Sequence, residues 1–150
     1  MPLFEQISRD IMTAMKARDK VRTDALRNIK KYFIEAKTAP GADGELSDEQ
    51  AVKILSKLSK QGHDTAALYR EKGREDLAQE EEAQALVIDE YLPKQLSAEE
   101  LEAEIRRIVA EEGATSMRDM GKVMGAASKQ LVGRADGKAI AALVKQILSA

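Results

Sequence analysis

The stretch YLPKQLSAEEL, residues 91–101, decides how the chain is divided. Pro93 disfavours a helical conformation at the residue before it, so a helix should end there. Ser97, followed three residues later by Glu100, is the capping-box pattern that begins a new helix. We therefore place a junction within this stretch. The two helical domains expected on either side of it are residues 1–92 and residues 97–150.

Upstream of the junction the sequence predicts four helices. Apolar residues at helical spacing indicate two helices in the first forty residues, with a break near Asp19. Ser47 and Gln50 form another capping-box pattern after a loop rich in Gly, and Gly73 should end the third helix. A fourth should start at about Glu75. The residues expected to face inward in these helices are Leu3, Ile7, Ile11, Met15, Leu26, Ile29, Phe33, Ile54, Leu58, Gln61, Thr65, Leu68, Leu77, Ala85, Ile88 and Leu92.

Downstream of the junction three shorter helices are expected, at about 97–112, 117–131 and 136–149. Ser116 and Asp136 carry the short polar side chains that are favoured immediately before a helix. No segment shows the alternation of apolar and polar residues that is typical of a half-buried strand. We therefore expect an all-α protein, with an N-terminal four-helix region followed by a small C-terminal three-helix module.

Composition excludes several classes of protein. The chain has no cysteine, so disulfide frameworks, thiolate nucleophiles and thiolate metal sites are excluded. The first residues lack the features of a signal peptide, and no run of eighteen apolar residues is present. These features favour a cytoplasmic protein that does not bind membranes. The net charge of −2 hides an uneven distribution, because residues 1–40 and 116–150 are each basic by four charges, whereas residues 41–115 are acidic by ten.

No catalytic residue, metal site or cofactor is expected from the residue pattern. His63 is the single histidine and has only Asp64 beside it in the sequence, so we interpret it as an exposed polar residue. The acidic run 80–82 is interpreted as a solvated helix face. Phosphate-binding loops, zinc-binding helix motifs and nucleophile elbows are missing from the sequence. These observations disfavour an enzyme.

The segment DMGKVMGAASKQLVGRADGK, residues 119–138, contains four of the nine glycines. Gly121 and Gly125 are four residues apart and share one face of a helix, where each costs about 1 kcal/mol of stability relative to alanine. One explanation is that another helix packs closely against this face. The other is that the bare backbone contacts a bulky ligand. The spacing alone leaves both explanations open.

Basic residues accompany these glycines, and Gly133 and Asp136 should end one helix and begin the next. The positive end of the last helix would then lie beside Arg134 and Lys138. Basic side chains beside exposed backbone suit a phosphate-bearing partner. The candidate RNA-binding residues are Arg118, Lys122, Gly125, Lys129, Gly133, Arg134 and Lys138, with Gly121 and Asp136 as structural support.

Structured RNA is favoured over DNA as the phosphate-bearing partner. The segment lacks a recognition helix with base-reading Asn or Gln side chains. Aromatic residues make up only 3% of the chain, so little surface is available to stack on single-stranded bases. Recognition of RNA shape and backbone is the remaining mode.

Several motifs resemble the GatB/YqeY family. They are DMGKVMG followed by KxxxGRADGK, with YLPKQLS and EEL upstream, and the resemblance extends to LFEQISRDIMTAMKARDKVRTDALR and REKGREDLAQEEEAQALVIDEYLP, so it covers nearly the whole chain. In the B subunit of the glutamine-dependent aspartyl/glutamyl-tRNA amidotransferase, a similar helical tail contacts tRNA. The resemblance therefore implies tRNA as a partner. The contact surface that it implies here is Lys122, Gly125, Lys129, Gly133, Arg134 and Lys138.

The family is associated with carbon–nitrogen ligase activity that uses glutamine as the amido-nitrogen donor. The chain lacks the cradle that would hold ATP, ammonia and the aminoacyl end, so we expect a non-catalytic accessory protein. Its C-terminal module would bind tRNA or a tRNA–protein complex, with an amidotransferase or an aminoacyl-tRNA synthetase as the protein partner. Two alternatives stay open, namely a helical protein–protein adaptor and a component of the amidotransferase activity itself.

Overall fold

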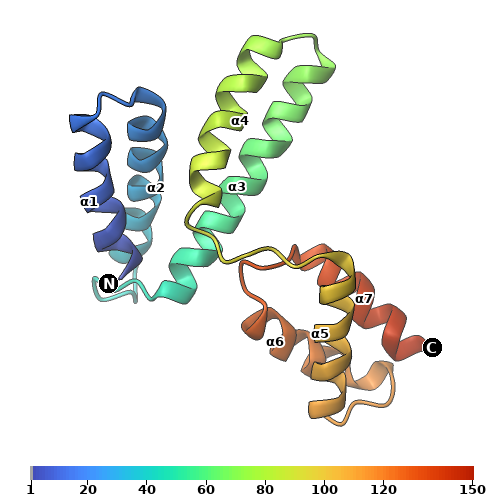
Figure 1. The fold of residues 1–150 in the computed structure, drawn as a ribbon. Helices are drawn as coiled ribbons and strands as arrows, with labels where there is room; N and C mark the ends of the chain where they lie inside the picture. The colour runs from blue at the N-terminus through green and yellow to red at the C-terminus, as the bar shows by residue number, and fades with distance from the viewer. Residues whose placement is uncertain (1) are drawn as a thin grey trace. The chain divides into compact units, whose positions relative to one another are not determined.

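The computed structural model describes residues 2–150, and all regular structure in this range is helical (Figure 1), as the all-α prediction requires. Seven α-helices and one short 3-10 helix, η1, follow one another within the described residues. Their bounds are α1 Leu3–Lys16, α2 Lys20–Thr38, α3 Asp48–Glu71, α4 Glu75–Asp89, α5 Ala98–Glu111, η1 Met117–Asp119, α6 Met120–Gln130 and α7 Gly137–Ser149.

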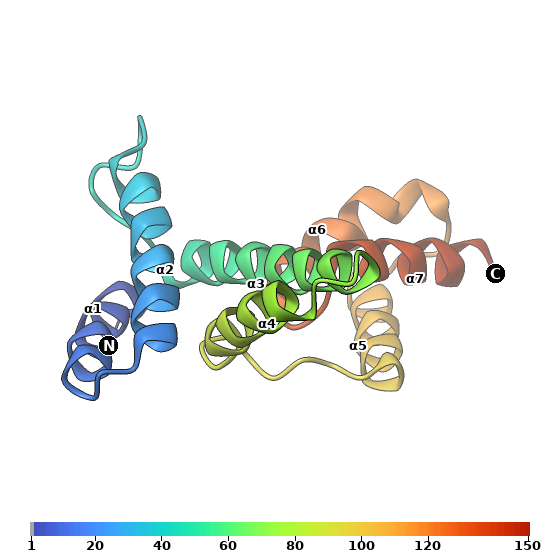
Figure 2. The ribbon, with the colours of Figure 1, turned by 90° about the horizontal axis from the view of Figure 1, so that it is seen from above.

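The chain forms two compact units, one ending at Leu92 and the other beginning at Pro93. In the first unit α1 pairs with α2, and α3 pairs with α4, which runs beside it in the opposite direction (Figures 1 and 2). Helix α2 also packs on α4, which joins the two pairs. The buried core of this unit is Ile7, Ile11, Ala14, Ala25, Leu26, Ile29, Phe33, Ala51, Leu55, Leu58, Val87 and Ile88.

Three inward positions expected from the sequence are wrong in this unit, and one of them, Gln61, is exposed on α3. Met15 is half exposed and Ala14 is buried in its place. A strict four-residue spacing advances about 40° too far at each step, since a helix turns about 100° per residue, so the last member of the series rotates out of the core. Leu68 is also half exposed, close to the end of α3.

Local signals at the helix ends are confirmed. Asp19 caps α2 by accepting from the Arg22 N–H at 3.0 Å, and Ser47 with Gln50 forms the expected capping box on α3. Gly73 follows the end of α3 with φ of +73°, a conformation that glycine adopts at little cost. These caps satisfy backbone groups that a helix end otherwise leaves without partners.

The second unit packs one stripe of each helix into a single core. Ser97 and Glu100 form the capping box that begins α5. Ser116 caps η1 rather than α6, which starts three residues later than the sequence indicates. The core residues are Leu101, Ile105 and Ile108 from α5, Val123 and Ala127 from α6, Leu131 after α6, and Ile140, Val144 and Leu148 from α7. No helix in residues 2–150 combines the length and apolar character needed to cross a lipid bilayer.

Candidate nucleic-acid interface

Helix α6 has one buried face and one open face. Val123 and Ala127 are fully buried, whereas Lys122 and Lys129, seven residues or about two turns apart, are exposed. Gly125 lies between these lysines along the helix, Gly121 directly precedes Lys122, and both glycines are exposed. We call this surface the open face of α6, and its residues are Gly121, Lys122, Gly125, Ser128 and Lys129.

The glycines on this face are not covered by another helix. A Cβ atom built on Gly121 or on Gly125 meets nothing within 4 Å outside its own helix. Within the described residues, the explanation by close helix packing is therefore wrong for both glycines. The close approach occurs instead at Gly62, where a Cβ atom would lie only 3.0 Å from the Cβ of Ala85 on α4.

The turn after α6 is held by the segment that precedes α5. The Leu96 N–H donates to the Arg134 carbonyl at 2.9 Å, and the Gln95 side-chain amide donates to the Gly133 carbonyl. In return Arg134 Nε donates to the Lys94 carbonyl at 3.3 Å. The two motifs PKQLS and GRADGK are thus joined, and Arg134 has a structural contact in addition to any ligand it binds.

Gly133 is buried and has φ of +74°, which fits its predicted place at the end of the α6 segment. The next helix begins at once, because Asp136 accepts from the Lys138 N–H at 3.3 Å and caps α7 as predicted. Lys138 lies in the first turn of α7 and its side chain is exposed. The first turn of a helix presents backbone N–H groups, so Lys138 adds its charge to a site that already favours anions.

The basic residues fall into two groups at the two ends of α6. Lys129, Arg134 and Lys138 surround the α6–α7 turn, whereas Arg118 lies in η1, directly before α6, and Lys122 lies in the first turn of α6. With eleven residues, α6 is about 16 Å long. Over that length a nucleic-acid strand presents several phosphates, so one strand can meet both groups.

Lys122, one of the two basic residues near the start of α6, contacts the C-terminal end of α5. Lys122 Nζ donates to the Glu112 carbonyl at 2.8 Å and lies 3.9 Å from its carboxylate, at the negative end of α5. Asp119 accepts from the Thr115 N–H at 2.9 Å, and the backbone N–H groups of Thr115 and Ser116 hold the pKa of Asp119 below its usual range. Lys122 is therefore positioned at the surface, where more than half of its side chain remains exposed.

The acidic charges of this unit are concentrated on α5. Its arginines are paired within the helix, since Arg106 contacts Glu102 at 3.0 Å and Arg107 contacts Glu104 and Glu111 at 2.7 Å each. Residues 116–150, by contrast, carry six Lys and Arg against two Asp. The net positive charge therefore belongs to the α6–α7 side of the unit.

His63 was misjudged from the sequence. Its Nδ1 lies 2.8 Å from a carboxylate oxygen of Glu82, and its Nε2 lies 2.8 Å from one of Asp89, both on α4. Ser59 donates to the other oxygen of Asp89, and Arg70 lies 3.6 Å from Glu82. We call these five side chains the His63 clamp. Glu82 is therefore not part of a purely solvated face.

The pKa of His63 reflects this environment. Burial disfavours the charged imidazolium, but the hydrogen bond and charge of Asp89, together with those of Glu82, outweigh burial and raise the pKa above its usual range. Two carboxylates facing the two ring nitrogens require a donor at both, which only the protonated ring provides. In its protonated form the ring therefore joins α3 to α4 by a bond to each carboxylate.

Tyr91, in the YLP motif, is a second residue whose contacts the sequence did not indicate. Its hydroxyl donates to Asp10 on α1 at 2.6 Å and receives a weaker bond from Arg22 on α2 at 3.4 Å. Arg22 also pairs with Glu90 at 2.6 Å. Burial, followed by the adjacent Asp10 carboxylate, raises the pKa of the Tyr91 phenol above its ordinary value. These contacts fasten the end of the first unit to its first two helices.

Comparison with known proteins gives two findings. The sequence model of the family described as "Yqey-like protein" matches residues 4–148. The chain is also similar to "Altered inheritance of mitochondria protein 41, mitochondrial" of Meyerozyma guilliermondii, with 37% identity over 87 residues, which are 57% of this chain and 44% of the relative. The chain thus covers less than half the length of that relative.

Proposed function

The chain belongs to the YqeY-like protein family, and from that premise we propose that it is a non-catalytic accessory protein that binds tRNA or a tRNA–protein complex through residues 93–150. The general relation of this family to the tail of the tRNA amidotransferase B subunit supports the choice of tRNA. The open face of α6 and the α6–α7 turn form the proposed contact surface.

The observation that carries the proposal is the open face of α6. Two glycines in an eleven-residue helix lower its stability, and nothing within 4 Å of either position offsets that cost. Lys122 and Lys129 lie on the same exposed face, one before and one after Gly125. A partner that must approach the helix axis closely, and that carries negative charge, accounts for both features.

Contacts with phosphate groups are enough to explain how this surface would bind RNA, although it has few groups that could read bases. Lys and Arg contacts to phosphates supply most of the sequence-independent affinity for nucleic acid and make that affinity depend strongly on salt. The surface offers basic side chains at both ends of α6 and a helix N-terminus at α7. Such an arrangement recognises the backbone of a folded RNA rather than its bases.

The test is a titration of fluorescently labelled tRNA with the full chain at several salt concentrations. Lys122, Lys129 and Lys138 are replaced together by Gln. Losing three phosphate contacts should weaken binding by between about tenfold and about a hundredfold and reduce the salt slope by about two to three. Arg134 is changed separately, because its Nε also holds the Lys94 carbonyl, and Lys122→Gln is measured alone as well, because Lys122 Nζ holds the Glu112 carbonyl.

A control variant carries the same change in charge elsewhere. Three exposed lysines outside the proposed surface are replaced by Gln, namely Lys57, Lys72 and Lys145. We expect this variant to keep most of the wild-type affinity. Equal affinity of the two triple variants, or wild-type binding that does not respond to salt, would show that the proposed surface does not bind tRNA.

A further inference from the structure

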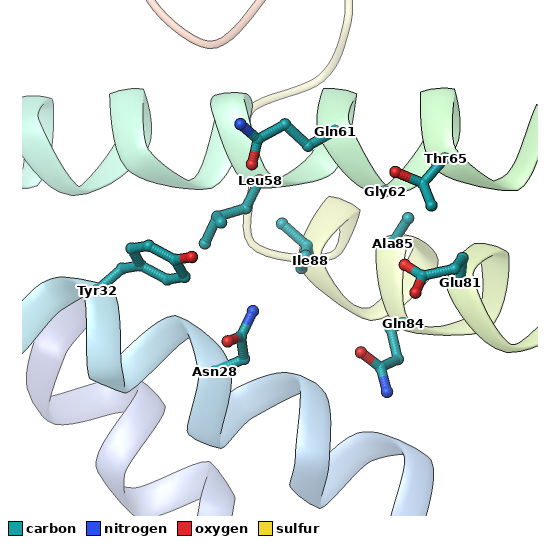
Figure 3. Close-up of a pocket in the computed structure, with 10 residues that line it drawn as sticks. All are labelled: Asn28, Tyr32, Leu58, Gln61, Gly62, Thr65, Glu81, Gln84, Ala85 and Ile88. Atoms are coloured by element: carbon teal, nitrogen blue, oxygen red, sulfur yellow. The ribbon is translucent and has the colours of Figure 1, made fainter. Parts of the chain in front are cut away.

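The first unit contains a hollow between α2, α3 and α4 with a volume of about 210 Å³ (Figure 3). Its base is apolar, formed by the buried side chains of Leu58, Ala85 and Ile88. Gly62 brings α3 onto α4 at this level, since a Cβ atom there would meet Ala85 at 3.0 Å. The volume is below the roughly 300–1,000 Å³ of pockets for drug-sized ligands, so its occupant is a small group.

Polar side chains from all three helices surround this base. Asn28 extends from α2, Gln61 and Thr65 from α3, and Glu81 and Gln84 from α4 (Figure 3). Within residues 2–150, none of these five side chains has a hydrogen bond or ion pair to another residue. Thr65, Glu81 and Gln84 are partly buried, whereas Asn28 and Gln61 are exposed, so the three partly buried side chains are the polar groups that a small ligand would meet above the apolar base.

The charge of the hollow is negative. Among its lining residues in the described part of the chain, Glu81 alone is charged, and it is partly buried. A neighbouring hollow of about 310 Å³ shares Glu81 and Gln84, and adds Asp24 and Glu80 against one basic residue, Lys20. An anionic ligand would be repelled here, whereas a cation would find a carboxylate in each hollow.

Carboxamide oxygens, hydroxyl groups and a carboxylate are acceptors for an ammonium group, which offers three donors. The apolar base suits the methylene chain that carries such a group. From this lining we propose that the α2–α3–α4 hollow binds an alkylammonium group, either of a linear polyamine or of a lysine side chain in a partner protein. The inference concerns the first unit and does not depend on RNA binding by the second.

The two neighbouring hollows can bind the two ammonium groups of one ligand. One ammonium group is held by Glu81, beside which Thr65 and Gln84 lie (Figure 3), and a second, several methylenes away, meets Asp24 and Glu80 in the neighbouring hollow. A diammonium chain therefore binds more tightly than a single amine. The ring of Tyr32, whose position at the rim Figure 3 shows, already has Lys31 Nζ 5.3 Å from its centre. The carboxylates, and not a cation–π contact, provide the attraction.

The experiment is an NMR titration of the uniformly ¹⁵N-labelled full chain at low salt, with spermidine in one series and a capped lysine-rich peptide in another. Saturable shifts in the side-chain amides of Asn28, Gln61 and Gln84 are expected in at least one series. Saturation by spermidine identifies a small polyamine, and saturation by the peptide alone identifies a protein partner. No saturable shift at these amides in either series, up to about 10 mM, overturns the proposal.

Two variants and a control make the result specific. Glu81→Gln should weaken binding about tenfold, because it removes the charge from the strongest acceptor. Thr65→Lys places a built-in ammonium group in the hollow and should abolish saturable binding. Glu71→Gln makes the same change in charge at the exposed end of α3 and should leave binding unchanged. If Glu81→Gln and Glu71→Gln weaken binding equally, the effect comes from the overall charge of the protein, and the proposed site is refuted.

Discussion

Replacing Gly125 by alanine should stabilise the second unit. Gly125 is the sixth of the eleven residues of α6, its φ is not in the left-handed region, and a Cβ atom there meets nothing within 4 Å. Alanine then adds about 1 kcal/mol in a helix interior without any steric cost. Gly121 is only the second residue of α6, in the first turn, so its replacement should add less.

The stability change is best measured by urea unfolding of the full chain, followed through NMR signals of residues 93–150, since two compact units need not unfold together. With a slope of about 1–2 kcal/mol/M, the midpoint for Gly125→Ala should rise by about 0.5–1 M. An unchanged or lower midpoint would refute the view that this face is open and that its glycines are costly.

A bulky side chain at Gly125 should weaken tRNA binding, although it should not lower the stability of the unit. Gly125→Leu fills the open face with a bulky side chain, so the unit should remain at least as stable as the wild type while tRNA affinity falls about tenfold or more. Ala142→Leu, at an exposed position of α7, is the matched control and should bind normally. Wild-type affinity in the Gly125→Leu variant would separate the glycines from RNA binding.

Three further changes test the contacts described above. The NMR signal of the single histidine, His63, should titrate above the ordinary pKa of 6.5. The stability that His63 contributes should be complete below pH 6.5 and should be lost as the pH rises through the raised pKa of the folded state. The free energy of unfolding of the His63→Gln variant should therefore depend less on pH, and parallel curves for the variant and the wild type would contradict this. Gly133→Ala should cost about 1–2 kcal/mol, seen as a lower urea midpoint, because φ of +74° strains an L-residue. Tyr91→Phe should lower the urea midpoint of the first unit, because the bond to Asp10 is lost, at about 1–2 kcal/mol. It should also remove from an alkaline absorbance titration a phenol that ionises above the ordinary pKa of tyrosine.

The helix ends could be predicted because their signals are local. Ser47, Ser97 and Asp136 each bond backbone N–H groups two or three residues away, so the relevant partners are visible in the sequence itself. The break at Asp19 and the end of α3 before Gly73 follow from the same kind of information. Helix content and most helix bounds therefore required no knowledge of packing.

Contacts between helices could not be predicted in this way. His63 meets Glu82 and Asp89, which are nineteen and twenty-six residues away, because α3 and α4 run side by side, and nothing beside His63 in the sequence indicates that pairing. The surroundings of the glycines could not be predicted from the sequence either. Spacing places Gly121 and Gly125 on one face, but only the packed structure shows that this face is open and that the close approach is at Gly62.

The bonds between residues 94–96 and the Gly133–Arg134 turn also affect how the second unit responds to truncation. A fragment that begins at Ser97 keeps every helix of the unit but removes the three contacts that hold the turn after α6. Its Gly133 and Arg134 carbonyls would lose their partners, and the turn that carries Arg134 would sample more conformations. Deleting Lys94 to Leu96 would therefore disturb a surface nearly forty residues further along the chain while leaving the helical content almost unchanged.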